Sequence, residues 1–100
     1  MPEFNQLTSA EEERMILLVE EAAEVIQAAT KILRHGFDSR NPLLTDSPTN
    51  RTDLETELGH LMHSVDLLTA AIDVDVTRIE QARDRKRLTI GPYLHHQPIG

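Results

Sequence analysis

The hydrophobic and polar positions of the chain follow a helical period from residue 15 onward. Ser9 and Glu12 have the spacing of a capping box, and Gly36 follows two basic residues, as is typical of a helix C-terminus. The pattern predicts a first helix over about residues 10–35. Its apolar stripe consists of Met15, Leu18, Ala22, Val25, Ala29 and Ile32, widened by Val19, Ile26 and Leu33.

Two further helices are predicted after a loop. Residues 37–49 are rich in Pro, Asp and Ser, which favour turns. Asn50 or Thr52 can cap a second helix over about residues 51–72, and Asp73–Asp75 can cap a third over about 76–88, which ends before Gly91. The second stripe consists of Leu54, Leu58, Leu61, Val65, Leu68 and Ile72.

These elements predict an all-α fold with one helical domain over residues 1–90 and a C-terminal tail, 91–100, without periodicity. A chain of 100 residues, with 39% hydrophobic residues and no Cys, forms a small core and often gains stability by oligomerising. Ile16, Leu17 and Ala28 lie outside the main stripe of the first helix. We therefore expect a helical bundle that is completed in a homodimer or homotetramer.

The net charge and the hydropathy of the chain limit the classes of partner and the compartment that we expect for it. A net charge of −7 makes it a poor general binder of nucleic acid or of anionic membranes. No apolar run approaches the roughly 20 residues that span a bilayer, and the N-terminus lacks the pattern of a signal peptide. These features predict a cytoplasmic protein with neither a nucleic-acid nor a membrane partner.

The first two predicted helices carry the same polar pattern. At about 100° per residue, Glu21 and Glu24 lie about 60° and 120° around the helix from Leu18. Glu57 and His60 have the same offsets from Leu54 on the second helix. If the two helices pack antiparallel, the edges that carry these residues can face each other.

Carboxylates that are crowded and partly buried repel one another and resist desolvation, and a cation relieves both costs. Hard cations such as Mg²⁺ prefer carboxylate oxygen. Glu21, Glu24, Glu57 and His60 are therefore candidate metal ligands. The alternative is a solvated helix face, because Glu is a good helix former and His60 can be an ordinary surface histidine.

The motifs "EEAAE" at residues 20–24 and "ELGH" at 57–60 resemble the EExxE…ExxD pattern of the MazG-type all-α nucleoside triphosphate pyrophosphohydrolases. The resemblance covers about Leu17 to Leu68. It implies a helical bundle, usually a dimer or tetramer, in which Mg²⁺ holds the triphosphate of a (d)NTP that is hydrolysed to the (d)NMP and pyrophosphate. The resemblance implies that Glu21, Glu24 and Glu57 are metal ligands. It implies that Glu20 is a further ligand or orients the attacking water, so Glu20 and Glu21 are the catalytic candidates.

The chain departs from that pattern at His60, where the family has Asp. Imidazole suits Mn²⁺, Co²⁺, Ni²⁺ or Zn²⁺ better than Mg²⁺. Three alternatives follow: a shifted metal preference, substitution by Asp53 one turn before Glu57, or loss of turnover. In the last case the protein is a degenerate, non-catalytic nucleotide-binding or helical interaction protein.

Other residues are candidates for contacts with the nucleotide. Lys31, Arg34 and, on the third helix, Lys86 can bind phosphate, although basic residues near helix C-termini also complement the helix dipole. Phe37 and the loop with Asn41 and Asn50 can line a base pocket. A phosphoribosyl-ATP pyrophosphohydrolase is a variant of the enzyme hypothesis, and a purely structural helical oligomer is the third alternative.

Overall fold

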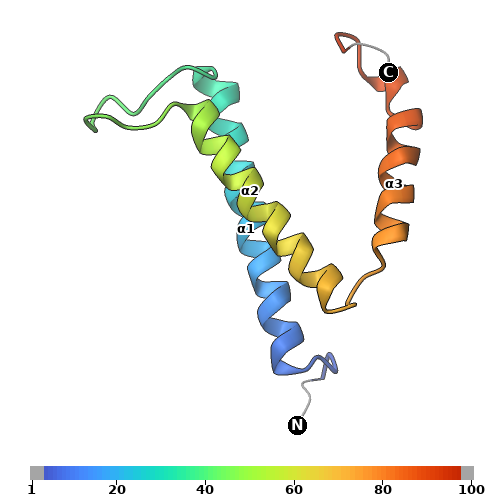
Figure 1. Cartoon of the computed structure of the whole chain (residues 1–100). Helices are drawn as coiled ribbons and strands as arrows, with labels where there is room; N and C mark the ends of the chain where they lie inside the picture. The colour runs from blue at the N-terminus through green and yellow to red at the C-terminus, as the bar shows by residue number, and fades with distance from the viewer. Residues whose placement is uncertain (1–3, 98–100) are drawn as a thin grey trace.

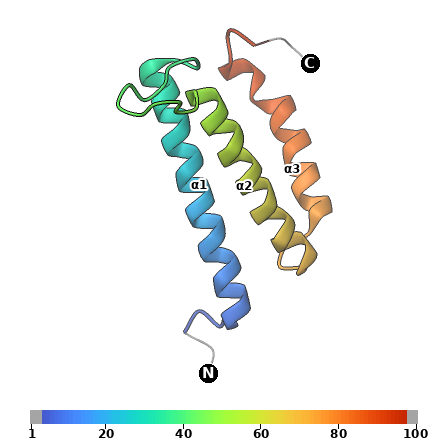
Figure 2. The same ribbon diagram turned by 60° about the vertical axis from the view of Figure 1, so that its left-hand side comes forward.

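The chain folds into three α-helices in the computed structural model, which describes residues 4–97. They are α1 (Ser9–His35), α2 (Asn50–Ala70) and α3 (Val76–Thr89), followed by a short 3-10 helix, η1 (Gly91–Tyr93). Both views show α1 and α2 side by side and antiparallel (Figures 1 and 2). Within residues 4–97 there is no strand, only an isolated bridge between Arg40 and Thr49, so the all-α prediction is confirmed.

The ends of α1 follow from local hydrogen bonds. The N-cap is Thr8, whose hydroxyl accepts from the Glu11 backbone N–H, while the Glu11 carboxylate accepts from the Thr8 N–H. The predicted pair, Ser9 and Glu12, was therefore one residue too late. Gly36 ends the helix as predicted, with φ of +87° and its N–H donating to the carbonyl of Ile32.

The start of α2 differs from the predicted caps, Asn50 and Thr52. Thr49 is the N-cap, and its hydroxyl accepts from the Thr52 N–H. Asn50 is buried and ties the two helices together: its backbone N–H donates to Ser39 and its side-chain amide donates to the carbonyl of Gly36. This bridge fixes where α1 ends relative to where α2 begins.

The α1–α2 hairpin buries few apolar residues. Leu68 and Ala28 are the buried apolar residues of the described chain, although Ala28 was expected outside the main stripe. Val19, Ile26 and Leu33 were expected to widen the stripe, but they are 67%, 66% and 87% exposed. The reason is that α1 has only one helix packed against it, so a wide stripe cannot be covered.

The third helix stands away from this hairpin. α3 makes no substantial contact with α1 or α2 in the described chain, as Figure 1 shows. The radius of gyration is accordingly 17.3 Å, compared with about 13 Å for a compact domain of this length. The predicted tail, 91–100, contains η1 rather than being wholly irregular; residues 98–100 lie outside the described chain.

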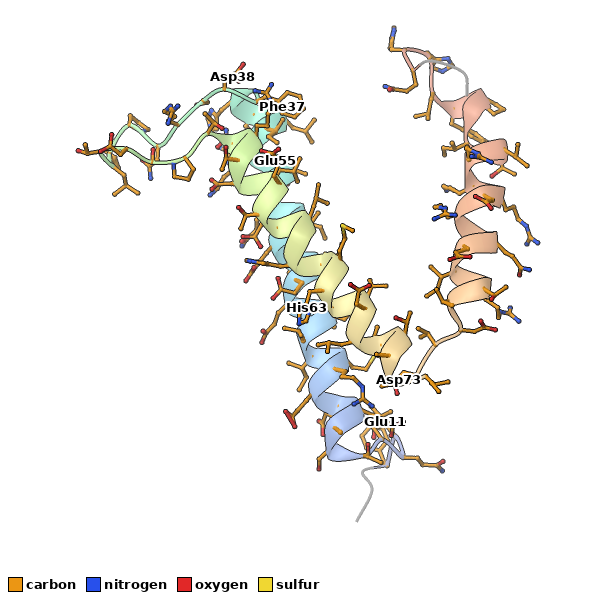
Figure 3. All side chains as sticks on the ribbon, viewed as in Figure 1. Glu11, Phe37, Asp38, Glu55, His63 and Asp73 are labelled. Atoms are coloured by element: carbon orange, nitrogen blue, oxygen red, sulfur yellow. The ribbon has the colours of Figure 1, made fainter. Side chains whose placement is uncertain are left out.

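The turn between α2 and α3 is fixed by a long-range ion pair. The Arg14 guanidinium donates to both carboxylate oxygens of Asp73, at 2.5 and 3.1 Å, and this pair lowers the pKa of the Asp73 carboxyl. Ile72, which was expected inside the second helix, has φ of +58° and is 85% exposed. A branched residue adopts this conformation only where its surroundings impose it. Figure 3 labels Asp73 at this turn.

A candidate metal centre between α1 and α2

Antiparallel packing of the hairpin brings four potential ligands together. Glu21 and Glu24 from α1 meet Glu57 and His60 from α2, and one ligand atom from each lies within 4.8 Å of the others. Each pair is spaced by three residues, so both members project from the same edge of their helix. The packing therefore places the two predicted edges face to face.

The centre of the cluster contains polar atoms that have no partner. The Oε2 atoms of Glu21 and Glu57 are buried and accept no hydrogen bond. The Nδ1 atom of His60 lies 3.6 Å from each of them, which is too long for a hydrogen bond. Buried carboxylate oxygens normally have a partner, so these two atoms mark a place that protein groups do not satisfy.

The charges in the cluster perturb Glu24. Its pKa is raised, first because its protonated form can share a hydrogen bond with Glu57, then because the two negative charges repel each other and the group is partly desolvated. The nearby His60 acts in the opposite direction. Neighbouring carboxylates raise one another's pKa in this way, and a cation bound among them would lower it.

This donor set fits a divalent cation. It offers three carboxylates and one imidazole, with two buried oxygens available for coordination. Carboxylate oxygen suits Mg²⁺ and Mn²⁺, and the imidazole moves the preference toward Mn²⁺ and later transition metals. Because ligands bind in their deprotonated form, we expect binding to weaken as the pH falls through the raised pKa of Glu24.

Two other acidic candidates lie near the cluster but outside it. Glu20 is exposed one turn before Glu24 and lines two hollows along the N-terminal half of α1, one of which also includes Leu67 of α2. Asp53, the possible substitute for His60, is one turn before Glu57 and lines a cavity at the loop end of the hairpin. The structure therefore does not bring either one into the group of four.

That cavity has a volume of about 850 Å³, and some of the residues that were predicted to contact phosphate or base line it. Lys31 and Arg34 line it together with Asn50. Lys31 is two turns after Glu24, and Asn50 is two turns before Glu57, so the cavity continues along the same edge about 10 Å from the cluster. The predicted loop residue Asn41 also lines it, and so do Ser39 and Arg40, which sequence reasoning missed because their position depends on how the loop folds back.

The remaining predicted contacts lie elsewhere. Phe37 is half exposed and packs under the Arg51 guanidinium, 4.9 Å from its ring centroid, instead of lining the cavity. Arg51 also pairs with Asp38, and Figure 3 labels Phe37 and Asp38 together at the end of α1. Lys86 is exposed on α3 and is therefore remote from the cluster within one chain.

Neither the hydropathy of the helices nor comparison with known proteins assigns a function to the chain. Among the described residues, no helix combines the length and the apolar character that crossing a bilayer requires. Comparison of the chain with models of known families, with curated proteins and with solved structures found no match.

Proposed function

We propose that the protein is a metal-dependent nucleotide pyrophosphohydrolase that converts a (d)NTP to the (d)NMP and pyrophosphate. The observation that carries this proposal is the cluster of Glu21, Glu24, Glu57 and His60, with two buried oxygens that lack a partner. The resemblance of residues 20–24 and 57–60 to the MazG-type pattern supplies the reaction class. The protein is expected to act as a homodimer or homotetramer.

In this proposal the cluster residues hold Mg²⁺ or, because of His60, Mn²⁺. When bound, such an ion neutralises phosphate charge and lowers the pKa of a coordinated water. Glu21, Glu24 and Glu57 supply the negative charge that retains it. Glu20, one turn from Glu24, orients the attacking water and accepts its proton, and the bond between the α- and β-phosphates breaks.

The cavity at the loop end supports a nucleotide as the substrate. Its cations are Arg34 and Lys31, and Lys31 lies two turns after Glu24 on the same edge of α1, so an elongated anion with several charges can contact both these cations and a metal held by the cluster. The acidic cluster alone would repel such an anion. A bound metal and the cations of the cavity would together reverse that repulsion.

The test is release of pyrophosphate from a panel of ribo- and deoxynucleoside triphosphates, with Mg²⁺ and Mn²⁺ in parallel. We expect release with at least one nucleotide, and its loss in Glu21→Gln. Glu55→Gln is the matched control, because it makes the same change on α2 at an exposed position outside the cluster (Figure 3). A folded wild type that releases nothing with either metal contradicts the proposal.

The exposed imidazole at the fourth position favours a second candidate, a nucleotide-binding protein without turnover. Two substitutions separate the candidates. If His60→Ala abolishes the activity of the wild type, His60 is a working ligand. If the wild type is inactive and His60→Asp gains activity, the natural protein is the non-catalytic form.

A further inference from the structure

The charges of this chain are divided between two parts that make no substantial contact with each other in the described chain. Residues 9–73, which form the hairpin and its turn, contain thirteen acidic and five basic residues, a formal charge of −8. The 14 residues of α3 contain five basic and two acidic ones, a formal charge of +3. A basic helix and an acidic hairpin attract each other, yet in one chain they are held apart.

The turn explains why α3 does not fold back on its own hairpin. The ion pair between Arg14 and Asp73 fastens the turn to α1, and Ile72 redirects the backbone at that point. Folding α3 back would require this turn to be rebuilt. Both hydrogen bonds that Arg14 donates to Asp73 link positions 59 residues apart, so the turn that precedes α3 is held by tertiary contacts.

One face of α3 suits a docked partner. Val76, Ile79, Arg83 and Lys86 are separated by three, four and three residues, so they lie along one side of the helix. All four are exposed. This side, which we call the α3 basic face, presents two apolar residues followed by two cations.

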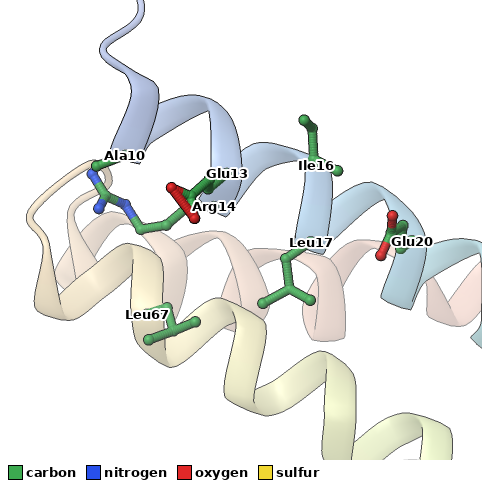
Figure 4. A pocket seen from close by; sticks show the side chains of 7 residues that line it. All are labelled: Ala10, Glu13, Arg14, Ile16, Leu17, Glu20 and Leu67. Carbon is green, nitrogen blue, oxygen red and sulfur yellow. The ribbon is translucent and has the colours of Figure 1, made fainter.

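A matching surface lies on the N-terminal half of α1. Ile16 separates two hollows of about 470 and 460 Å³, and each has an apolar floor with acidic residues beside it. Figure 4 shows Leu17 of α1 and Leu67 of α2 pointing toward each other in the first hollow, whereas Ile16 points away from α2. Glu12 lines one hollow and Glu13 the other, and the Arg14 cation nearby is already paired with Asp73.

We propose that the α3 basic face of one chain docks on this acidic surface of α1 in a second copy, and that the second copy docks in the same way on the first. The exchange is symmetric, so in one two-fold dimer each α3 basic face contacts the acidic surface of the other copy. It covers Ile16, Val76 and Ile79, which one chain leaves exposed. Glu20 lines both hollows, so the docked helix would lie beside the residue that the proposed function assigns to the attacking water.

Charge reversal tests the pairing directly. The first variant is Arg83→Glu with Lys86→Glu, and the second is Glu12→Lys with Glu13→Lys. Each homodimer would bring like charges together, so by sedimentation velocity we expect each variant alone to dimerise about tenfold or more weakly than the wild type. Mixed in equal amounts, the two variants present opposite charges at both contacts, and we expect the dimer to be restored.

Far-ultraviolet circular dichroism establishes that each variant retains its helices, and rescue in the mixture shows that neither failed to fold. A wild type that is monomeric at tens of micromolar overturns the proposal. So does a mixture that does not regain the dimer, or a pair of variants that each dimerise like the wild type. Salt-sensitive binding of a DNA or RNA oligonucleotide through α3 by a monomeric wild type would assign the basic face to nucleic acid instead.

Pyrophosphate release is measured separately. Loss of the dimer with activity retained would leave the proposed function standing. An intact dimer without any activity would contradict that function and leave the docking proposal in place.

Discussion

Glu57 is the position at which the metal hypothesis makes its sharpest prediction. In the absence of a divalent cation, the ionised ligand atoms of Glu21 and Glu57 lie within 4.8 Å of each other. Two unit charges at that distance repel by about 1 kcal/mol in bulk water and about 3.5 kcal/mol at an effective dielectric constant of 20. The two side chains are 14% and 23% exposed, so the repulsion falls between these limits.

Glu57→Gln removes that repulsion while it keeps the size of the side chain. In EDTA we therefore expect the variant to be more stable than the wild type by about 1–3 kcal/mol, which for a domain of this size raises the melting temperature by at least about 4 °C. With Mn²⁺ the effect reverses. A cation present at about a hundred times its Kd stabilises the wild type by about 2.7 kcal/mol, and the variant, with one ligand fewer, gains less.

The assay is thermal unfolding followed by circular dichroism in EDTA and in increasing MnCl2. Glu55→Gln serves as the control, since it removes the same charge from the same helix outside the cluster. It should gain as much from Mn²⁺ as the wild type does. The reasoning is refuted if Mn²⁺ stabilises Glu57→Gln as strongly as the wild type, or if this variant is less stable than the wild type in EDTA.

Two further predictions concern polar groups outside the cluster. Ser64 is 1% exposed and its hydroxyl has no hydrogen-bond partner. Ser64→Ala should therefore raise the free energy of unfolding, measured by chemical denaturation, by about 1 kcal/mol. A decrease of that size would mean that the hydroxyl is hydrogen-bonded. Arg14 lowers the pKa of Asp73 in the folded state, so their ion pair stabilises the fold at pH values above 3.8, the ordinary pKa of an Asp carboxyl. Asp73→Asn should therefore lower the melting temperature at neutral pH. The difference between wild type and variant should shrink as the pH falls below that value, and a pH-independent difference would contradict the ion pair.

Periodicity and cap residues predicted the helices closely because both are local. The error at the start of α1 has a simple cause: Thr8 with Glu11 and Ser9 with Glu12 have the same capping-box spacing. The choice between them depends on which residue adopts the extended backbone, and Thr8 does so at φ −71° and ψ 165°. Sequence spacing alone does not decide this.

The metal candidates could be found from sequence because each helix carries its pair at one fixed spacing, and antiparallel packing needs only a hairpin. The direction of α3 could not be found in this way. It depends on Arg14 and Asp73, which are far apart in the sequence, and on the unusual backbone of Ile72. The fold of the loop that lines the cavity also escaped prediction, since it depends on hydrogen bonds such as the one that the buried Asn50 amide donates to the Gly36 carbonyl.

The proposed cation site and the proposed docking surface lie on the same helix, and their separation predicts how they interact. Glu13 is eight residues before Glu21, about 12 Å along α1. This exceeds the Debye length of about 8 Å at physiological ionic strength but is well within the length of about 30 Å at 10 mM salt. A bound divalent cation makes the hairpin less acidic and so weakens its attraction for α3, but only where salt does not screen the charges.

We therefore expect Mn²⁺ to leave the dimer Kd unchanged within about twofold at physiological salt and to weaken the dimer at about 10 mM salt. Sedimentation at the two salt concentrations, with Mn²⁺ or EDTA, measures both effects, and Glu57→Gln shows whether the cation acts through the cluster. A large effect of Mn²⁺ at physiological salt would contradict docking near Glu12 and Glu13. It would place α3 of the second copy over the carboxylate cluster itself, where Lys86 could reach a phosphate.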